Sequence, residues 1–394
     1  MGKNNSIDFM QSLKRAKSVT VVAFIFNGLA LGTVVARIPD IKKSLFLTNA
    51  QVGISLLFIA VGVFSALKPA GKLCAKFGSR PIIVIGTLAI SVATAVIAFS
   101  NTLTELRVAL FLLGYATATH DIAMNAHAVT LEKKSNQRMM GFFHANFSIG
   151  TLIGGVFGGL LSQFKISLLI QELSISVIYL IVLVFIRNSY LPASADIHIK
   201  EENFVKSKSP VIFWILGLFG LCAAMGEGAA GDWGGVLARE SFNASPFVST
   251  LPYIIYSLMM VVGRLSCDRL ANRFGSANAI RGGGFISGTG LAIGLIIGNT
   301  GGVIFGWFCI GLGLSIVMPL IFSAAGELAH GKYNGQVAPS VAVARVSGTA
   351  YFGFMVGPPL IGFISDHIQL RWAMLLVVGL SYLMLLAGKF AKTD

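Results

Sequence analysis

The sequence predicts an all-α membrane protein, and three observations lead to this class. The 394 residues are 55% hydrophobic and only 12% charged, with a mean hydropathy of +0.79, whereas a soluble domain needs roughly a quarter of its residues charged. Apolar runs of about 20 residues, the length that a helix needs to cross a bilayer, recur along the whole chain. Alternating segments of about ten residues, which would indicate a membrane barrel, do not recur.

Twelve apolar runs are expected to form transmembrane helices. The first run follows Lys14, Arg15 and Lys17 as the core of a signal peptide would. It is too long for such a core and leads into no small-residue cleavage site, so we expect it to be retained as the first helix. The predicted spans are 18–38, 50–69, 81–100, 104–131, 141–163, 167–187, 211–238, 247–266, 279–298, 302–327, 337–364 and 369–390.

The chain divides into two related halves. The stretch "AGKLCAKFGSRP" at 70–81 returns as "CDRLANRFGSAN" at 267–278, and the offset of 197 residues is half the chain. Both copies lie between the second and third helix of their half, so we predict two pseudo-symmetric six-helix bundles that arose by duplication. The predicted parts are an N-terminal arm at 1–17, bundles at 18–187 and 211–390, a linker at 188–210 and a tail at 391–394.

The net charge of +14 is explained by membrane topology. If the N-terminus is cytoplasmic, 22 of the 30 Lys and Arg fall in the termini and the even-numbered loops, seven fall on the opposite side, and Arg345 falls within a helix. This asymmetry follows the positive-inside rule and predicts that both termini, the arm and the linker are cytoplasmic. The cations then face anionic lipid, and a nucleic acid partner is not expected.

The segment between the second and third helices also carries a family pattern. Residues 71–80 read G-x-L-x-x-[KR]-x-G-x-[KR], which resembles the loop signature of the major facilitator superfamily, transporters with six plus six helices and alternating access to a central site. The stretches "ARIPDIK", "HANFSIGTLIGG", "EGAAGDW" and "FMVGPPLIGFISDH" are similar to little-characterised members near the fucose:proton symporter branch. The resemblance implies a monomeric transporter of the bacterial inner membrane, without cofactor or metal.

The chain departs from the superfamily pattern at three points. Ala75 stands where the loop signature usually has aspartate, and Asn272 stands at the same position of the second copy. Asp268 therefore becomes the candidate for an acidic residue that holds the inner gate of the second half closed. Gly155 replaces the proline of the antiporter signature, and Leu110 stands where proton-driven exporters tend to carry arginine. These departures favour symport over drug export. The candidate gate and loop residues are Gly71, Lys72, Gly78, Arg80, Asp268, Arg269, Arg273 and Gly275.

Three acidic residues are noted inside the predicted helices, where ionisable groups are costly and usually face a cavity. Asp121 lies near the midplane of the fourth helix and shares a face with Asn125. Glu227 and Asp232 lie in the outer half of the seventh helix. Asp121 and Glu227 are the proton-coupling candidates, since a carboxylate in such a place can load and release a proton. The structural alternatives are a permanent interhelical hydrogen bond for Asp121 and a pair with Arg37 for Glu227.

Polar and aromatic side chains supply the candidates for substrate binding. Asn27, at the centre of the first helix, is suited either to bind a solute or to join helices. The run "GEGAAGDWGG" at 226–235 predicts a break in the seventh helix that forms an outer gate, although Trp233 also fits an interfacial belt. Core packing is the alternative for each aromatic residue. The candidates are Asn27, Asn125, His144, Asp232, Trp233, Tyr256 and Tyr351.

The leading functional hypothesis is secondary active transport of a small polar, sugar-like solute by alternating access, with proton symport. Efflux of an amphipathic compound is the alternative, and a membrane sensor without transport activity is a further one. An enzyme is not predicted, because the sequence has no metal-ligand spacing, no nucleophile elbow and no Walker loop.

Overall fold

The computed structural model describes residues 2–137, 139–195, 210–333, 337 and 339–390. All regular elements among these residues are helices, with no strand among them. Ten segments are long and apolar enough to cross a membrane. The two other predicted spans form α4 (Leu103–Ser135) and α12 (Pro339–His367). The predicted fold class, an all-α membrane protein with twelve spans, is confirmed.

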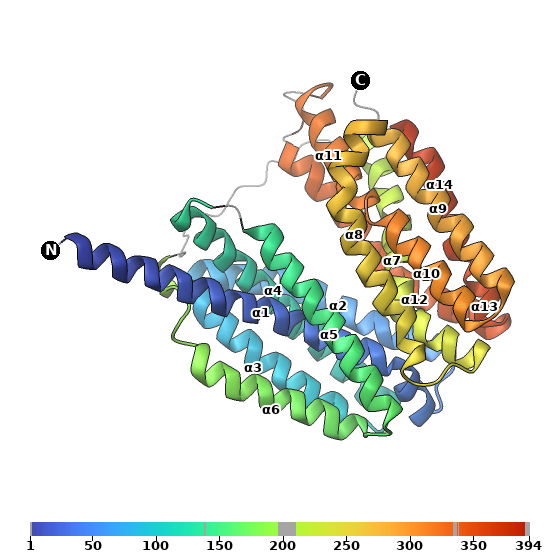
Figure 1. Cartoon of the computed structure of the whole chain (residues 1–394), viewed down its shortest axis with the longest axis horizontal. Coiled ribbons are helices and arrows are strands. Elements are labelled where there is room, and N and C mark those ends of the chain that lie inside the picture. Colours follow the sequence, from blue (N-terminus) through green and yellow to red (C-terminus); the bar gives the residue numbers. More distant parts are fainter. Residues whose placement is uncertain (1, 138, 196–209, 334–336, 338, 391–394) are drawn as a thin grey trace. The chain divides into compact units, whose positions relative to one another are not determined.

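Each predicted span corresponds to one helix or to a pair of consecutive helices (Figure 1). Two short 3-10 turns, η1 and η2, lie among them. Besides α4 and α12, the elements are α1 (Gly2–Ser44), α2 (Asn49–Phe77), α3 (Ser79–Ala98), α5 (Met140–Gln163), α6 (Leu168–Ile186), η1 (Ala193–Ala195), α7 (Val211–Phe242), η2 (Val248–Thr250), α8 (Leu251–Phe274), α9 (Ser276–Ile297), α10 (Thr300–Leu314), α11 (Val317–His330), α13 (Leu370–Ala373) and α14 (Leu375–Phe390).

The helices group into two compact units. Unit 1 comprises Met1–Arg37 and Phe58–Glu202, and unit 2 comprises Ile38–Leu57 and Asn203–Asp394. The C-terminal part of α1 and the N-terminal part of α2 therefore belong to unit 2. Most of the predicted linker 188–210 and the whole predicted tail 391–394 lie outside the described residues.

Unit 1 is built around α3, which packs against both α4 and α6 (Figure 1). Glycines bring α5 close to α1: a Cβ added at Gly154 would lie 2.8 Å from the carbonyl oxygen of Leu29, and one at Gly150 would lie 2.1 Å from that of Ile25. Only residues without a side chain permit this approach, and such pairs replace the hydrophobic driving force that lipid does not supply. The "HANFSIGTLIGG" stretch thus positions α5 on α1.

Unit 2 is built around α7, which packs mainly on α12, while α9 packs on α10 and α14. A Cβ at Gly353 of α12 would lie 2.3 Å from the carbonyl oxygen of Leu221 of α7. Trp233 and Trp307 are completely buried in this unit. Trp233 therefore does not form part of an interfacial belt, which was one interpretation of the sequence.

The predicted break in the seventh helix is wrong. The α7 helix is continuous from Val211 to Phe242, and its glycines serve close packing, as Gly234 does against Pro252 and Trp307. A break occurs instead in the span predicted as 302–327, at Ser315 and Ile316 between α10 and α11. Pro319 accounts for it, because proline has no N–H for the carbonyl of Ser315 and its ring crowds that carbonyl.

The turn between the second and third helices has the same backbone in both halves. Gly78 has φ 80° and ψ 163°, and Gly275 has φ 77° and ψ 148°. This region is essentially restricted to glycine. The 197-residue repeat in the sequence is therefore also a repeat of backbone conformation.

Candidate functional site

Asp121 and Asn125 lie on α4, which begins with a capping box. The Thr102 side chain accepts a hydrogen bond from the N–H of Glu105 at 3.2 Å, and the Glu105 carboxylate accepts one from the N–H of Thr102 at 3.1 Å. From this capping box the helix runs without interruption to Asp121 and Asn125. Both residues are half-buried. The Asn125 amide donates to the carbonyl and the carboxylate of Asp121, at 2.8 and 3.1 Å, so this hydrogen bond lies within α4.

Asn27 of α1 is directed at α4. Its side chain is 2% exposed, and its amide nitrogen lies 3.0 Å from the carbonyl oxygen of Thr117 and 3.2 Å from Nδ1 of His120. The His120 ring is fully buried, and its Nε2 has no hydrogen-bond partner among the described residues. Asn27 thus joins two helices of unit 1, which is the alternative that the sequence left open for it.

Two other histidines of unit 1 have different surroundings. His127 is buried, with Nδ1 at 2.9 Å from the Ser79 hydroxyl and Nε2 accepting from the N–H of Leu191 at 3.3 Å. It therefore ties α4 to the start of α3 and to the chain after α6. His144 of α5 is exposed, and its ring packs edge-on against Phe24.

A buried charged network in unit 1 was missed by the sequence analysis. Glu172 of α6 is 0% exposed and accepts from the Gln171 amide at 2.9 Å. Arg37 of α1 donates to the Gln171 oxygen at 2.8 Å and to the carbonyl of Ile166 at 3.0 Å. Glu172 falls inside the predicted span 167–187, and its place in an apolar run was the signal that would have identified it.

In unit 2 the Glu227 carboxylate of α7 faces Arg264 of α8, with Oε2 3.7 Å from Nη2. The Glu227 side chain is 9% exposed, whereas that of Arg264 is 50% exposed. Its second oxygen, Oε1, is buried without a hydrogen-bond partner in the described part of the chain. Tyr256 is buried within electrostatic reach of both charges. In the sequence, Arg264 was counted only among the cations that set the membrane topology, and Arg37 was considered as the partner of Glu227.

Asp232 lies one turn further along α7 and is half-buried. A Cβ built at Gly228 would lie 3.7 Å from Oδ2 of Asp232 and 3.2 Å from a ring carbon of Phe354 on α12. Tyr351 is 47% exposed, and its ring centroid is 6.4 Å from that of Phe354. A carboxylate and aromatic rings are thus gathered on facing parts of α7 and α12, while the neighbouring Trp233 is buried in the core.

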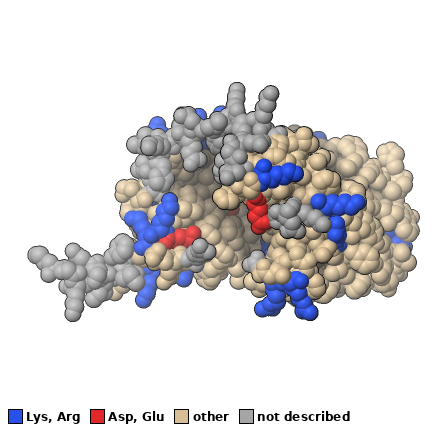
Figure 2. All heavy atoms as spheres, turned by 90° about the horizontal axis from the view of Figure 1, so that it is seen from above, with Lys and Arg blue, Asp and Glu red and all other residues tan. Residues whose placement is uncertain are grey.

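The candidate gate residues lie in the two turns of the repeat and in the helices that flank them. Gly78 and Gly275 form the turns, whereas Gly71 lies within α2 with open space around it. Arg80 donates to the carbonyl of Arg187 and to the side chain of Asn188. The side chain of Asp268 lies outside the described residues. Lys72, Arg269 and Arg273 are exposed; in the view of Figure 2, Lys and Arg side chains are more widespread than Asp and Glu.

The segment 38–57 is fastened within unit 2 by three acidic side chains. Asp40 forms an ion pair with Arg239 of α7. Lys42 forms one with Glu240 of the same helix. The Asp366 carboxylate of α12 accepts from two backbone N–H groups at the start of α2, those of residues 49 and 50, at 2.9 and 3.2 Å. A carboxylate in this position also interacts favourably with the positive end of the α2 dipole.

Long apolar helices that carry buried charges and amides define a polytopic membrane protein of the solute-transporter class. Comparison with known proteins identifies the family. The model of the Major Facilitator Superfamily matches residues 20–339, and the chain belongs to this superfamily. An uncharacterised MFS-type transporter of Yersinia pestis is 31% identical over 352 residues, which are 88% of each chain. These relationships indicate a transporter and not an enzyme.

Other relatives and solved structures have more divergent sequences. The class H tetracycline resistance protein of Pasteurella multocida is 22% identical over 376 residues, covering 90% of this chain and 91% of that protein. A mutant of the nucleoside transporter NupG superposes with a TM-score of 0.78 at 13% identity, over 96% of this chain and 99% of that chain. The E. coli fucose:proton symporter FucP superposes with a TM-score of 0.61 at 20% identity, over 95% and 98% of the two chains.

Proposed function

We propose that this protein is a secondary active transporter that carries a small polar, sugar-like solute by alternating access, coupled to proton symport. The proposed location is the bacterial inner membrane, with both termini in the cytoplasm. The observation that carries the proposal is the Glu227–Arg264 pair, in which one carboxylate oxygen is buried without a hydrogen bond from any residue that the structure describes.

The pair suits proton coupling for a physical reason. At 3.7 Å the two charges attract each other without a short hydrogen bond. If Glu227 takes up a proton, this attraction is lost, and Arg264 becomes available to a solute or to water. A group that exchanges one partner for another in this way links proton binding to solute binding through a single carboxylate. Asp121, held by Asn125 within α4, is the second candidate for a proton site.

The solute class is supported by the residues around Asp232. A carboxylate accepts hydrogen bonds from hydroxyl groups, and the Phe354 and Tyr351 rings offer flat apolar faces of the kind that pack on sugar rings. Two of the similar solved structures are those of a nucleoside transporter and of a fucose:proton symporter. Nucleosides and fucose both carry sugar hydroxyls. We therefore infer a neutral, hydroxyl-rich solute.

Efflux of an amphipathic compound is the second candidate. It is favoured by the tetracycline resistance relative, whose match extends over 90% of this chain. It is disfavoured by Leu110 and Gly155, which stand where exporters of this type tend to have arginine and proline.

Reconstitution into liposomes with an enclosed pH dye tests the proposal. A panel of hexoses, nucleosides and tetracycline is added outside, and acidification of the lumen is recorded. Glu227→Gln is expected to lower solute-driven acidification at least tenfold, while exchange of labelled for unlabelled solute continues because exchange needs no net proton movement. Asp121→Asn is compared in the same assay.

The matched control is Glu327→Gln, the same change at an exposed carboxylate of α11, which is expected to behave as the wild type. Acidification by Glu227→Gln at the wild-type rate would exclude Glu227 as the coupling site. Tetracycline-driven alkalinisation with no response to any hexose or nucleoside would establish efflux. If no solute of the panel moves, while a transporter of known activity moves its own solute in vesicles prepared in the same way, the transport proposal is contradicted.

A further inference from the structure

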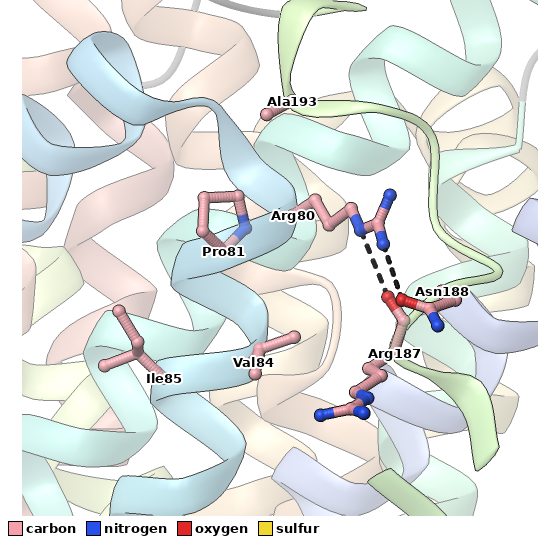
Figure 3. A pocket seen from close by; sticks show the side chains of 7 residues that line it. All are labelled: Arg80, Pro81, Val84, Ile85, Arg187, Asn188 and Ala193. Atoms are coloured by element: carbon pink, nitrogen blue, oxygen red, sulfur yellow. Dashed lines mark hydrogen bonds between the residues drawn. The ribbon is translucent and has the colours of Figure 1, made fainter. Parts of the chain in front are cut away.

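A pocket of about 460 Å³ opens on unit 1 where α3 begins and α6 ends (Figure 3). Its polar lining comes from Arg80, Arg187 and Asn188, and none of its lining residues is acidic. The remaining lining includes Pro81, Val84 and Ile85 of α3. The pocket is thus amphiphilic, with positive charge at one side and apolar side chains at the other.

The two arginines have different roles in this pocket. Arg80 is held in place, since its Nε donates to the Arg187 carbonyl at 3.1 Å and its Nη2 to the Asn188 oxygen at 2.8 Å. These two bonds leave further N–H groups of the Arg80 guanidinium for a ligand. The Arg187 side chain extends away from that of Arg80 (Figure 3). It is exposed, and in the part of the chain that the structure describes no hydrogen bond engages its guanidinium.

An exposed apolar surface continues from the pocket along both helices. On α3, Ile85 and Val92 are 54% and 60% exposed, and on α6, Val184 and Phe185 are 61% and 78% exposed. The two helices lie side by side (Figure 1), so this surface runs in one direction from the arginines. In a membrane protein such a surface is covered by acyl chains.

We propose that the pocket binds the phosphate head group of an anionic phospholipid whose acyl chains lie along the exposed faces of α3 and α6. Guanidinium groups bind phosphate through charge-assisted hydrogen bonds. A phosphodiester carries one negative charge, and both arginines add to the positive potential at this side of the pocket. The apolar wall of Pro81, Val84 and Ile85 suits the glycerol and acyl part of a lipid and offers no hydrogen bond to a free phosphate. The predicted topology puts the pocket at the cytoplasmic leaflet, where anionic lipid is abundant.

Native mass spectrometry of the full-length protein in detergent tests this site. Phosphatidylglycerol, phosphatidylcholine with the same acyl chains, and glycerol 3-phosphate are titrated separately. The wild type is expected to bind phosphatidylglycerol most tightly, and Arg187→Gln to weaken that binding about tenfold, as expected for loss of a hydrogen bond between charged groups. Arg187 is preferred to Arg80 for substitution, because Arg80 also holds the end of α6.

Arg281→Gln is the matched control. Like Arg80, Arg281 lies on the third helix of its half, α9. Like Arg80, it also donates to a backbone carbonyl at the last helix of its half, here that of Leu385 at 3.4 Å, but it is not part of the pocket. It is expected to keep wild-type binding. Equal weakening by both substitutions would indicate a general charge effect and overturn the proposal. Unchanged binding in Arg187→Gln, or binding of glycerol 3-phosphate as tight as that of phosphatidylglycerol, would also overturn it.

Discussion

Replacing Gly78 with alanine is expected to destabilise the protein far more than the same change at Gly275, its counterpart in the second half. Both residues have nearly the same positive φ, 80° and 77°, so the backbone strain from a new Cβ is similar at the two sites. Their surroundings differ. A Cβ at Gly78 would lie 2.4 Å from the carbonyl oxygen of Ala193, whereas a Cβ at Gly275 would meet nothing within 4 Å.

The magnitude follows from these two contributions. Backbone strain in this region costs about 1–3 kcal/mol, and this is the whole effect expected for Gly275→Ala. At Gly78 the clash with a backbone atom adds about 1–3 kcal/mol, as other overpacked sites do, for a total of roughly 2–6 kcal/mol. Gly71→Ala is the third member of the series, because Gly71 lies within α2 in open space, and alanine there should stabilise by up to about 1 kcal/mol.

Thermal unfolding in detergent, followed by the loss of monodisperse protein on size-exclusion chromatography, checks this series. The expected order of Tm is Gly71→Ala at or above the wild type, then Gly275→Ala, then Gly78→Ala. Equal losses at Gly78 and Gly275 would refute the contact with Ala193, and an unchanged Tm for Gly275→Ala would refute the strained turn.

Three further outcomes are expected in the same unfolding assay. Asp366→Asn should lower the Tm by an amount corresponding to about 1 kcal/mol, because the negative charge at the start of α2 is lost. Asp40→Asn and Arg239→Gln should each lower the Tm, and the double variant should lose less than the sum of the two; additive losses would show that the ion pair contributes nothing. Glu172→Leu should lower the Tm more than Glu172→Gln, since glutamine keeps an acceptor for Gln171; equal losses would contradict the network.

The fold class could be predicted because it depends on the length and spacing of apolar runs, which the sequence displays directly. The internal repeat was visible for a similar reason, since the positive φ of Gly78 and Gly275 is required by the turn itself; the further contact of Gly78 with Ala193 was not visible in the sequence. The continuity of α7 was not predictable in this way. Glycine weakens an isolated helix, but in α7 the glycines are where α12 and other helices approach, and this packing outweighs the local propensity.

The sequence predicted which residues belong to the candidate site better than it predicted the contacts that they make. Glu227 and Asp232 were found because acids in apolar runs are rare, whereas the partner Arg264 was counted with the cations of a loop. Glu172 lies in an apolar run as Glu227 does, but it was not among the predicted residues. Partners such as these are brought together by helix packing, so a single sequence does not specify them.

The link between Arg37 and Gln171 has a consequence for biogenesis. The two residues are 134 positions apart, so α6 leaves the ribosome on the order of ten seconds after α1 at ordinary rates of synthesis. During that interval the arginine at the end of the first helix is already at the membrane while the amide and carboxylate that surround it in the finished protein are still being translated. Insertion of the sixth helix thus completes the polar environment of the first.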